Sequence, residues 1–335
     1  MKFGPVPLSQ AEGAILAHSV GLPSGRLRKG QLLDRGHLDQ MASAGLAEVI
    51  VASPDPGDVL ENDAALRLAQ ALVPDPQAVH LTLSHAFTGR MNVTAAGPGV
   101  VVLDPDRIAR LNAIDPMLTL ATVPQHQQMG QGGMVATVKV ISYAVPEASV
   151  AAAEALLSGG SPLALHPPVL RRARLIVTEI PSGPGEKGVE AIRNRLSALN
   201  ITLDQVIPVA HRQHAIRDAL LAAGAQDLTL ILTASATSDP YDVAPQALRD
   251  AGGHVERFGM PVDPGNLLFL GDLHGQPVIG LPGCVRSPAL NGADWVLSRV
   301  ACGVPVSGAD IAGMGVGGLL KEIPTRPQPR SGRRT

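Results

Sequence analysis

The stretch "RLIVTEIPSGPGEKGVEAIRNRLSALNITLDQVIPVA", residues 174–210, decides the fold of the second half of this chain. It opens with an apolar run, passes through a Gly- and Pro-rich turn into a helical pattern at 189–200, and ends in a second apolar run at 203–210. A strand, a helix and a second strand of this kind form a βαβ unit, whose two strands lie parallel in one sheet. The runs are apolar throughout, as strands covered on both faces are.

The same alternation continues toward the C-terminus. A helical pattern at 214–224 is followed by the apolar run "LTLILTA" at 228–234 and by another helical pattern at 243–253. The runs "NLLFL" and "PVIGL", joined by the turn "GDLHGQ", then predict a β-loop-β unit, and residues 288–301 predict a last helix. The sequence therefore predicts an α/β domain with a mainly parallel sheet over residues 173–304.

The first half of the chain, residues 1–157, has a different pattern. Short β-rich runs such as "EVIVA" and "MVATVKVISYAV" stand beside two helical patterns, "DRGHLDQMASAG" and "ENDAALRLAQAL". We expect Asp34 to cap the first helix, and Asn62 or its acidic neighbours to open the second. The prediction is an irregular α+β N-terminal domain.

Two segments read as connections rather than as domains. Residues 158–172 contain two glycines, three prolines and no acid, which is typical of a linker. Residues 305–335 are Gly- and Pro-rich and end in basic residues, which predicts a disordered tail.

Composition excludes several classes of protein. With 335 residues, 45% of them apolar, the chain is long enough for about two domains. The net charge of -2 and the scattered Lys and Arg give no support to nucleic-acid binding. Its apolar runs are far shorter than the ~20 residues of a membrane-spanning helix. Two cysteines, Cys284 and Cys302, and the lack of a leader pattern predict a reduced, cytoplasmic protein.

Polar residues follow the predicted strands where ligands of doubly wound sheets bind, beyond the carboxyl ends. They are Thr178, Glu179 and Ser182, then Thr233, Ser235, Asp239 and Asp242, and finally Asp263, Asn266, Arg286 and Ser287. Hydroxyls and amides bind phosphate, Asn reads a heterocycle edge, Arg holds an anion, and carboxylates suit Mg²⁺. The predicted ligand is a phosphorylated, polar, ring-containing small molecule. The alternative is that Asp239 and Asp242 only cap the next helix.

Three other motifs leave alternatives open. "GPGEKG", residues 183–188, has the dinucleotide spacing G-x-G-x-x-G, but Asp204 stands at the beginning of the next strand and not at its end, so an NAD-dependent oxidoreductase is a remote alternative. "HRQH" contains His211 and His214 at metal-ligand spacing, yet no third ligand is near, and a polar helix start is favoured. Cys284 beside Arg286 is either a nucleophile or a small side chain in a crowded turn, and the second is favoured.

Residues 174–303 resemble the molybdopterin-binding domain shared by the MogA, MoaB and MoeA proteins of molybdenum-cofactor biosynthesis. The resemblance is carried by "TASATSDPYD" at 233–242, "VDPGN" at 262–266 and "GLPGCVRSP" at 280–288. Through "KGQLLDRGHLDQMASAGLAEVIVA" and "TGRMN", the N-terminal half resembles a MoeA-like subgroup whose exact role is unsettled.

The resemblance implies a three-layer α/β/α fold for the second domain, like that of MogA, and a ligand that is molybdopterin or its adenylylated form. It assigns cofactor binding to Thr178, Glu179, Ser182, Gly183, Thr233, Ser235, Asp263, Pro264, Gly265, Asn266, Pro282, Gly283, Cys284, Arg286 and Ser287. For an enzyme, it implies molybdate insertion by a molybdopterin molybdotransferase-like transferase, with Asp242 or Asp239 assisting and binding Mg²⁺. The alternative is a non-catalytic carrier, whose partner is a nucleotidyltransferase or an apo-molybdoenzyme. Self-association into a homo-oligomer is also expected.

The sequence departs from the family pattern at three places. Thr233 and Ala234 replace the paired glycines of the loop after the third strand, which narrows backbone access to a ligand. After the first strand, the family's Thr-Gly-Asp-Glu is here Thr-Glu-Ile-Pro, so the expected acid is missing or displaced to Glu179. Cys284 and Val285 replace an Asn-Pro pair. These changes leave pterin binding easier to retain than molybdate insertion.

Overall fold

The computed structural model describes residues 1–222, 224 and 226–320 of the chain. They divide into two compact units. Unit 1 comprises Met1–Ala96, Val101–Gln125 and Gln131–Leu165, and unit 2 comprises Gly97–Val100, His126–Gly130 and the chain from His166 onward. The segment predicted as a linker, 158–172, contains a short strand, β14 (Leu163–His166).

Unit 1 combines short strands with four helices among its described elements. The elements between residues 2 and 157 are β1 (Lys2–Pro7), the 3-10 turn η1 (Leu8–Gln10), β2 (Ile15–Leu16), β3 (Val20–Leu22), β4 (Gly25–Leu27), α1 (Arg35–Ser43), β5 (Glu48–Ser53), β6 (Asp58–Leu60), α2 (Glu61–Leu72), β7 (Leu81–Leu83), β8 (Arg90–Ala95), β9 (Gly99–Leu103), α3 (Pro105–Asn112), β10 (Leu118–Thr122), β11 (Gln128–Met129), β12 (Met134–Val140), β13 (Ala144–Pro146) and α4 (Glu147–Leu157). Within unit 1 the sheets have the orders β1-β5-β2, β10-β12-β8-β7, β13-β6 and β3-β4. The end of β11 and the start of β9 pair antiparallel in unit 2.

The two helices predicted in this half are present, and α2 begins at the acidic neighbours of Asn62 as expected, although only α1 has a side-chain cap. The Asp34 side chain accepts a hydrogen bond from the His37 backbone N–H, 2.9 Å away, and so caps α1. The start of α2 has no side-chain cap, because the Asn62 side chain instead accepts from the Gly89 backbone N–H in another loop. Helices α3 and α4 were not predicted.

Unit 2 contains one six-stranded mixed sheet. Its elements are β15 (Arg172–Glu179), α5 (Val189–Ser197), β16 (Thr202–Ala210), α6 (Gln213–Ala222), β17 (Leu228–Leu232), α7 (Val243–Asp250), β18 (His254–Phe258), β19 (Phe269–Leu273), β20 (Gln276–Leu281), the 3-10 turn η2 (Gly283–Arg286), α8 (Gly292–Ala301) and α9 (Gly308–Gly313). The strand order is β16-β15-β17-β20-β19-β18, in which the first four strands are parallel and the last two pairings are antiparallel. This confirms the predicted α/β class with a sheet that contains parallel strands.

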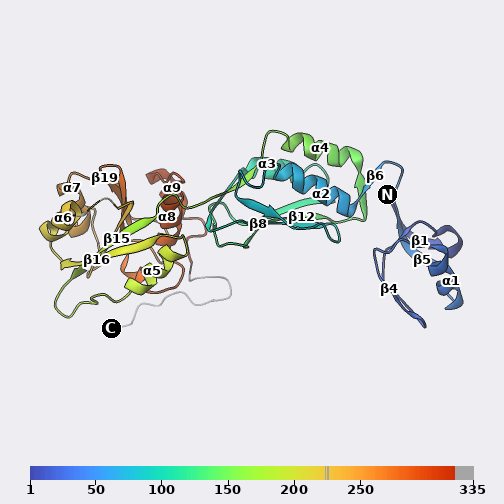
Figure 1. The fold of residues 1–335 in the computed structure, drawn as a ribbon, viewed down its shortest axis with the longest axis horizontal. Coiled ribbons are helices and arrows are strands. Elements are labelled where there is room, and N and C mark those ends of the chain that lie inside the picture. Colours follow the sequence, from blue (N-terminus) through green and yellow to red (C-terminus); the bar gives the residue numbers. More distant parts are fainter. Residues whose placement is uncertain (223, 225, 321–335) are drawn as a thin grey trace. The chain divides into compact units, whose positions relative to one another are not determined.

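The core of unit 2 explains the apolar run in the middle of β15. Leu175, Ile176 and Val177 of β15 are all fully buried, although successive side chains of a strand point to opposite faces. Ile176 lies in a cluster with residues of α6 and α7, which pack together over one face (Figure 1). Of the other helices of unit 2, α5 packs against β16 and α8 packs against β20. A complete three-layer arrangement stays a prediction.

The segment predicted as a disordered tail differs in its first part. Residues 308–313 form α9, because the Ser307 side chain accepts from the Asp310 backbone N–H in a capping box and Ile311 is buried. Backbone hydrogen bonds also join Asp263 to Gly318 and to Leu320. Residues 321–335 of the predicted tail lie outside the described residues. In the part of the chain that is described, no helix is long and apolar enough to cross a membrane.

Candidate functional site

The strand register of unit 2 brings the predicted site loops to one edge of the sheet. Near the carboxyl ends, Thr178 of β15 pairs with Val209 of β16, and Leu232 of β17 pairs with Leu281 of β20. The loops 180–188, 233–242 and 282–287 therefore leave the sheet side by side. The turn 259–268 begins there too, because Phe269 pairs with Gly280 near the end of β20.

Arg286 cross-links these loops. Its Nη2 donates to the Thr233 carbonyl at 3.0 Å, and its Nη1 donates to the carbonyls of Gly185 and Lys187. Its Nε makes no hydrogen bond with the residues that the structure describes. Burial, with no acid contributing, lowers the pKa of the Arg286 guanidinium. This side chain thus carries a positive charge into a group of neutral carbonyls.

Gly188 makes this close packing possible. Its φ of +99° is left-handed, and an added Cβ would lie 2.7 Å from Cα, Cβ and Cγ of Arg286. The last glycine of "GPGEKG" therefore has a structural explanation in this turn. Asp204 lies at the other end of β16, where its carboxylate pairs with Arg172. A dinucleotide site needs an acid at the carboxyl end of β16. Among the described residues, no acid stands at that position.

Thr178 and His211 join the ends of three strands. Thr178 is fully buried, and its contact with a ligand stays a prediction. Its Oγ1 accepts from the Ala234 backbone N–H at 2.8 Å and lies 2.9 Å from Nδ1 of His211. His214 is an exposed residue of α6. Among the described residues, no group of three or more His, Cys, Asp and Glu side chains is placed to hold a metal ion.

The two acids assigned to Mg²⁺ bond to the backbone around them. Oδ1 of Asp242 accepts from the Val243 N–H at 2.6 Å and Oδ2 accepts from the Ser238 N–H at 2.9 Å, so Asp242 caps α7. Oδ1 of Asp239 accepts from the Tyr241 N–H at 2.8 Å. The capping alternative describes the bonds of Asp242, whereas Asp239 bonds within the turn that precedes α7. Each oxygen keeps a further lone pair, so the pair fits a Mg²⁺ that arrives with a substrate phosphate better than one held by protein alone.

The turn at 263–266 is anchored to the start of α8. Gly265 has a φ of +144°, and a Cβ there would lie 2.9 Å from the backbone N and Cα of Gly292. The Gly292 N–H donates to the Pro264 carbonyl at 2.8 Å, and the Asp263–Pro264 peptide bond is cis. Asn266 remains exposed at the surface. The turn therefore holds an amide side chain at the edge of the sheet.

Cys284 is an exposed free thiol whose sulfur accepts from Nδ2 of Asn291 at 3.0 Å. Asn291 is completely buried and its Oδ1 caps α8 through the Ala293 N–H. Arg195 of α5 pairs with Asp294 and donates to carbonyls of the same loop. Asn291 and Arg195 were not predicted as site residues, although an Asn directly before a helical pattern is a signal for a cap.

The predicted site residues differ in accessibility. Glu179, Ser182, Gly183, Ser235, Asp239, Asn266, Gly283, Cys284 and Ser287 are exposed; Asp242, Asp263 and Arg286 are half-buried; Thr178, Thr233, Pro264, Gly265 and Pro282 are buried. The structure thus gathers exposed polar groups at one edge over a buried layer that supports them.

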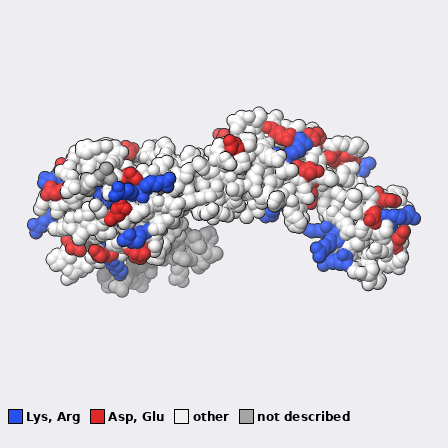
Figure 2. Space-filling view, in the orientation of Figure 1, with Lys and Arg blue, Asp and Glu red and all other residues white. Residues whose placement is uncertain are grey.

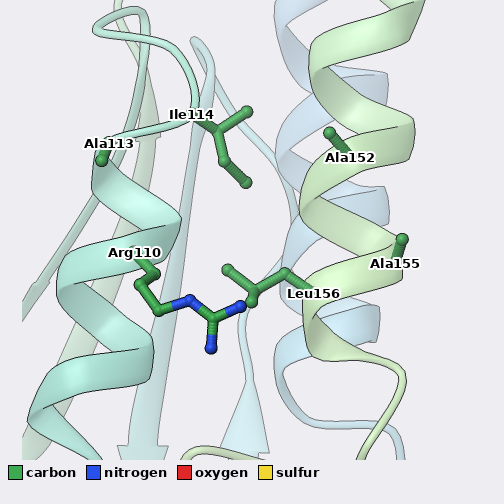
Figure 3. A pocket seen from close by; sticks show the side chains of 6 residues that line it. All are labelled: Arg110, Ala113, Ile114, Ala152, Ala155 and Leu156. Carbon is green, nitrogen blue, oxygen red and sulfur yellow. The ribbon is translucent and has the colours of Figure 1, made fainter.

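Two surface features of unit 1 lie apart from these residues in the sequence. An open groove of about 550 Å³ runs between α3 and α4, where the Arg110 side chain extends toward Leu156 beside Ile114 and three alanines (Figure 3). Basic side chains also gather at the β3–β4 hairpin (Figure 2), whose sequence carries Arg26, Arg28 and Lys29. None of the predicted site residues lines that groove.

Comparisons with known proteins give limited likenesses. A family model described as a domain of unknown function (DUF8806) matches residues 5–53. No curated protein matches the chain. The chain is similar to a molybdopterin biosynthesis MoeA protein from Pyrococcus horikoshii, with 13% identity and a TM-score of 0.31 over 90% of this chain and 76% of that one.

Two further solved structures are similar to this chain. Molybdenum cofactor biosynthesis protein B shows 13% identity and a TM-score of 0.28, over 39% of this chain and 88% of that one. Another MoeA structure, from Pyrococcus horikoshii OT3, shows 12% identity and a TM-score of 0.26, over 93% of this chain and 75% of that one. These values do not assign the chain to a family.

Proposed function

We propose that unit 2 binds molybdopterin or adenylyl-molybdopterin at the carboxyl edge of its sheet and acts in molybdenum-cofactor biosynthesis. The observation that carries the proposal is Arg286, a cation that joins the predicted loops and whose hydrogen bonds to the described residues all go to carbonyls. An anion bound there gains an attraction that no acid of the described residues cancels. A phosphorylated ligand fits this charge.

The exposed groups around Arg286 suit the rest of such a ligand. Backbone N–H groups at the start of α5 and the hydroxyls of Ser182 and Ser287 are donors for phosphate. The amide of Asn266 can read the edge of a pterin ring. We assign the buried Thr178 and Thr233 to support of the loops, in place of direct contact.

Molybdate insertion is the finer part of the proposal. Asp242 and Asp239 would hold a Mg²⁺ that neutralises phosphate charge, and molybdate would enter as a substrate. The alternative is a carrier that shelters the ligand until a nucleotidyltransferase or an apo-molybdoenzyme receives it. The capping bonds of Asp242 favour neither, because they leave lone pairs on both oxygens.

The remaining parts of the proposal concern the whole chain. We propose that α5 and α8 form the second helical layer of unit 2, that the protein works in the cytoplasm, and that it self-associates. The contact between the turn 259–268 and the start of α8, where Gly265 lies close to Gly292, would then belong to the pterin-binding part of unit 2. Size-exclusion chromatography with light scattering measures the oligomeric state.

Anaerobic equilibrium binding with purified molybdopterin tests the central claim. We expect micromolar or tighter affinity for the full chain, and no detectable affinity at micromolar concentration would reject both the enzyme and the carrier.

A single-turnover assay with adenylyl-molybdopterin and molybdate then separates these two. For an enzyme, Asp242→Asn binds but does not convert the ligand, because Asn keeps the capping oxygen and loses the charge. A carrier gives no conversion with either protein.

A further inference from the structure

The hydrogen-bond partners of the buried Thr178 hydroxyl can be counted. Its hydroxyl has one proton to donate, and the side chain is fully buried. The Ala234 N–H, 2.8 Å away, uses one of its lone pairs. Among the described residues, the remaining partner within hydrogen-bonding distance is Nδ1 of His211, at 2.9 Å.

Two arrangements of the protons are possible. If Nδ1 of His211 carries a proton, it donates to Thr178, and the hydroxyl proton of Thr178 is left buried without an acceptor. If Nδ1 is bare, the hydroxyl donates to it and every group is satisfied. A buried donor without a partner is the costlier state, so the bare Nδ1 is favoured.

We propose that His211 and Thr178 are a positioning pair: the neutral His211 ring carries its proton on Nε2, and its Nδ1 accepts from the Thr178 hydroxyl that orients the Ala234 N–H. The main chain reinforces this geometry, because the His211 N–H donates to the Glu179 carbonyl at 2.9 Å. Thr233, next to Ala234, is held by Arg286. The pair thus sets the loop after β17, where Thr233 and Ala234 replace the glycines of the family pattern.

His211 also has a role at the proposed ligand site, and this role rests on the proposed function. With Nδ1 engaged by Thr178, Nε2–H is the ring's remaining donor, and no described residue accepts from it. His211 is half-buried directly after β16, at the edge where the predicted loops converge. We assign His211 the role of a positioning residue for the loop after β17, rather than that of a metal ligand.

The imidazole ¹⁵N chemical shifts of His211 in the full chain test the tautomer without any ligand. We expect the neutral ring to carry its proton on Nε2. A neutral ring with its proton on Nδ1 would overturn the proposal.

Hydrogen exchange of the Ala234 amide tests the positioning role. In Thr178→Val we expect exchange to rise about tenfold, since a hydrogen bond is worth roughly one such factor. Thr178→Ser, which restores the hydroxyl, and Thr202→Val, an exposed threonine at the opposite end of β16, are expected to exchange like the parent. His211→Asn, which keeps an acceptor, is expected to protect Ala234 better than His211→Phe.

Molybdopterin binding by the same variants links the pair to the proposed site. We expect Thr178→Val and His211→Phe to lose roughly tenfold in affinity, and Thr178→Ser to recover it. Unchanged exchange in Thr178→Val would overturn the positioning pair even if molybdopterin binds. A parent protein that fails to bind molybdopterin rejects the proposed function alone, because the tautomer and the exchange are measured without ligand.

Discussion

Arg172 at the amino end of the six-stranded sheet and Arg286 at its carboxyl end have different partners. At the amino end, Arg172 pairs with Asp204, and Asp227 accepts from the backbone N–H groups of Arg171 and Arg172. At the carboxyl end, Arg286 donates to carbonyls and has no acid partner in the described residues. Paired charges at an exposed edge contribute little and attract no ligand, whereas an unpaired cation among loops is available to an anion.

The carboxyl end contains two kinds of polar residue. Some of them, such as Thr178, are buried and bond to the protein, and others, such as Asn266, are exposed. A ligand site needs both, because the exposed donors must be held in place by a satisfied layer beneath them. At the amino end, Arg172 is exposed and paired, and Arg174 is buried and donates to the Thr229 hydroxyl and the Leu220 carbonyl, so neither is an accessible cation without a partner.

Gly188→Val has the largest expected effect on the carboxyl end. A Cβ there collides with Arg286 and the residue must keep a left-handed φ, so we expect a loss of about 2–4 kcal/mol in the free energy of unfolding. The single tryptophan, Trp295, reports unfolding of unit 2 in urea. As the control, Gly185→Ala has a φ of +52° but nothing within 4 Å of the new Cβ, and is expected to cost only about 1 kcal/mol. Equal losses would show that the contact with Arg286 is unimportant.

Arg286→Gln tests whether the unpaired cation binds the ligand. Charge-assisted hydrogen bonds are worth about 1.5–3 kcal/mol, so we expect molybdopterin affinity to fall by about 10- to 100-fold. Arg172→Gln removes the paired cation at the amino end and is expected to leave affinity unchanged. Binding titrations of both variants measure the difference. Equal affinities would remove the distinction between the two ends.

Asp242 distinguishes capping from metal binding. Asp242→Ala removes the cap of α7 and is expected to cost about 1 kcal/mol of unfolding free energy, whereas Asp242→Ser keeps a capping oxygen and costs a few tenths. Both variants remove the carboxylate and are expected to abolish any Mg²⁺ dependence of ligand binding. A Ser variant that retains this dependence would move the metal to Asp239 or away from both.

A smaller effect concerns Asp310, the acid that pairs with Arg299 of unit 2. Hydrogen bonds from Ser307, with Arg299 nearby, lower the pKa of Asp310 from 3.8 to about 2. Because the folded-state pKa lies below the ordinary value, this stabilisation is present above about pH 4 and is lost as the pH falls toward 2. We expect the parent to be more stable than Asp310→Asn at pH 5, with a smaller difference at pH 2.5. A difference independent of pH would contradict this assignment.

Local patterns predicted much of the fold. Apolar runs and helical periodicity between residues 174 and 253 matched β15 to α7 within a few residues, and Asp34 was correctly expected to cap α1. The same reasoning failed for Asn62, which has the chemistry of a cap but bonds to Gly89, 27 positions away. It also missed β18, whose short run "HVERF" is half-exposed at the edge of the sheet.

By itself the sequence determined the alternation of strands and helices in unit 2 and the set of polar residues that follow its strands. Those features depend on neighbours within one or two turns of chain. Only the tertiary structure decided that Thr178 is buried and that Arg286 holds carbonyls. The reason is that the bonds of Thr178 and Arg286 span 33, 56 and 101 positions, and no local pattern records which side chain fills such a gap.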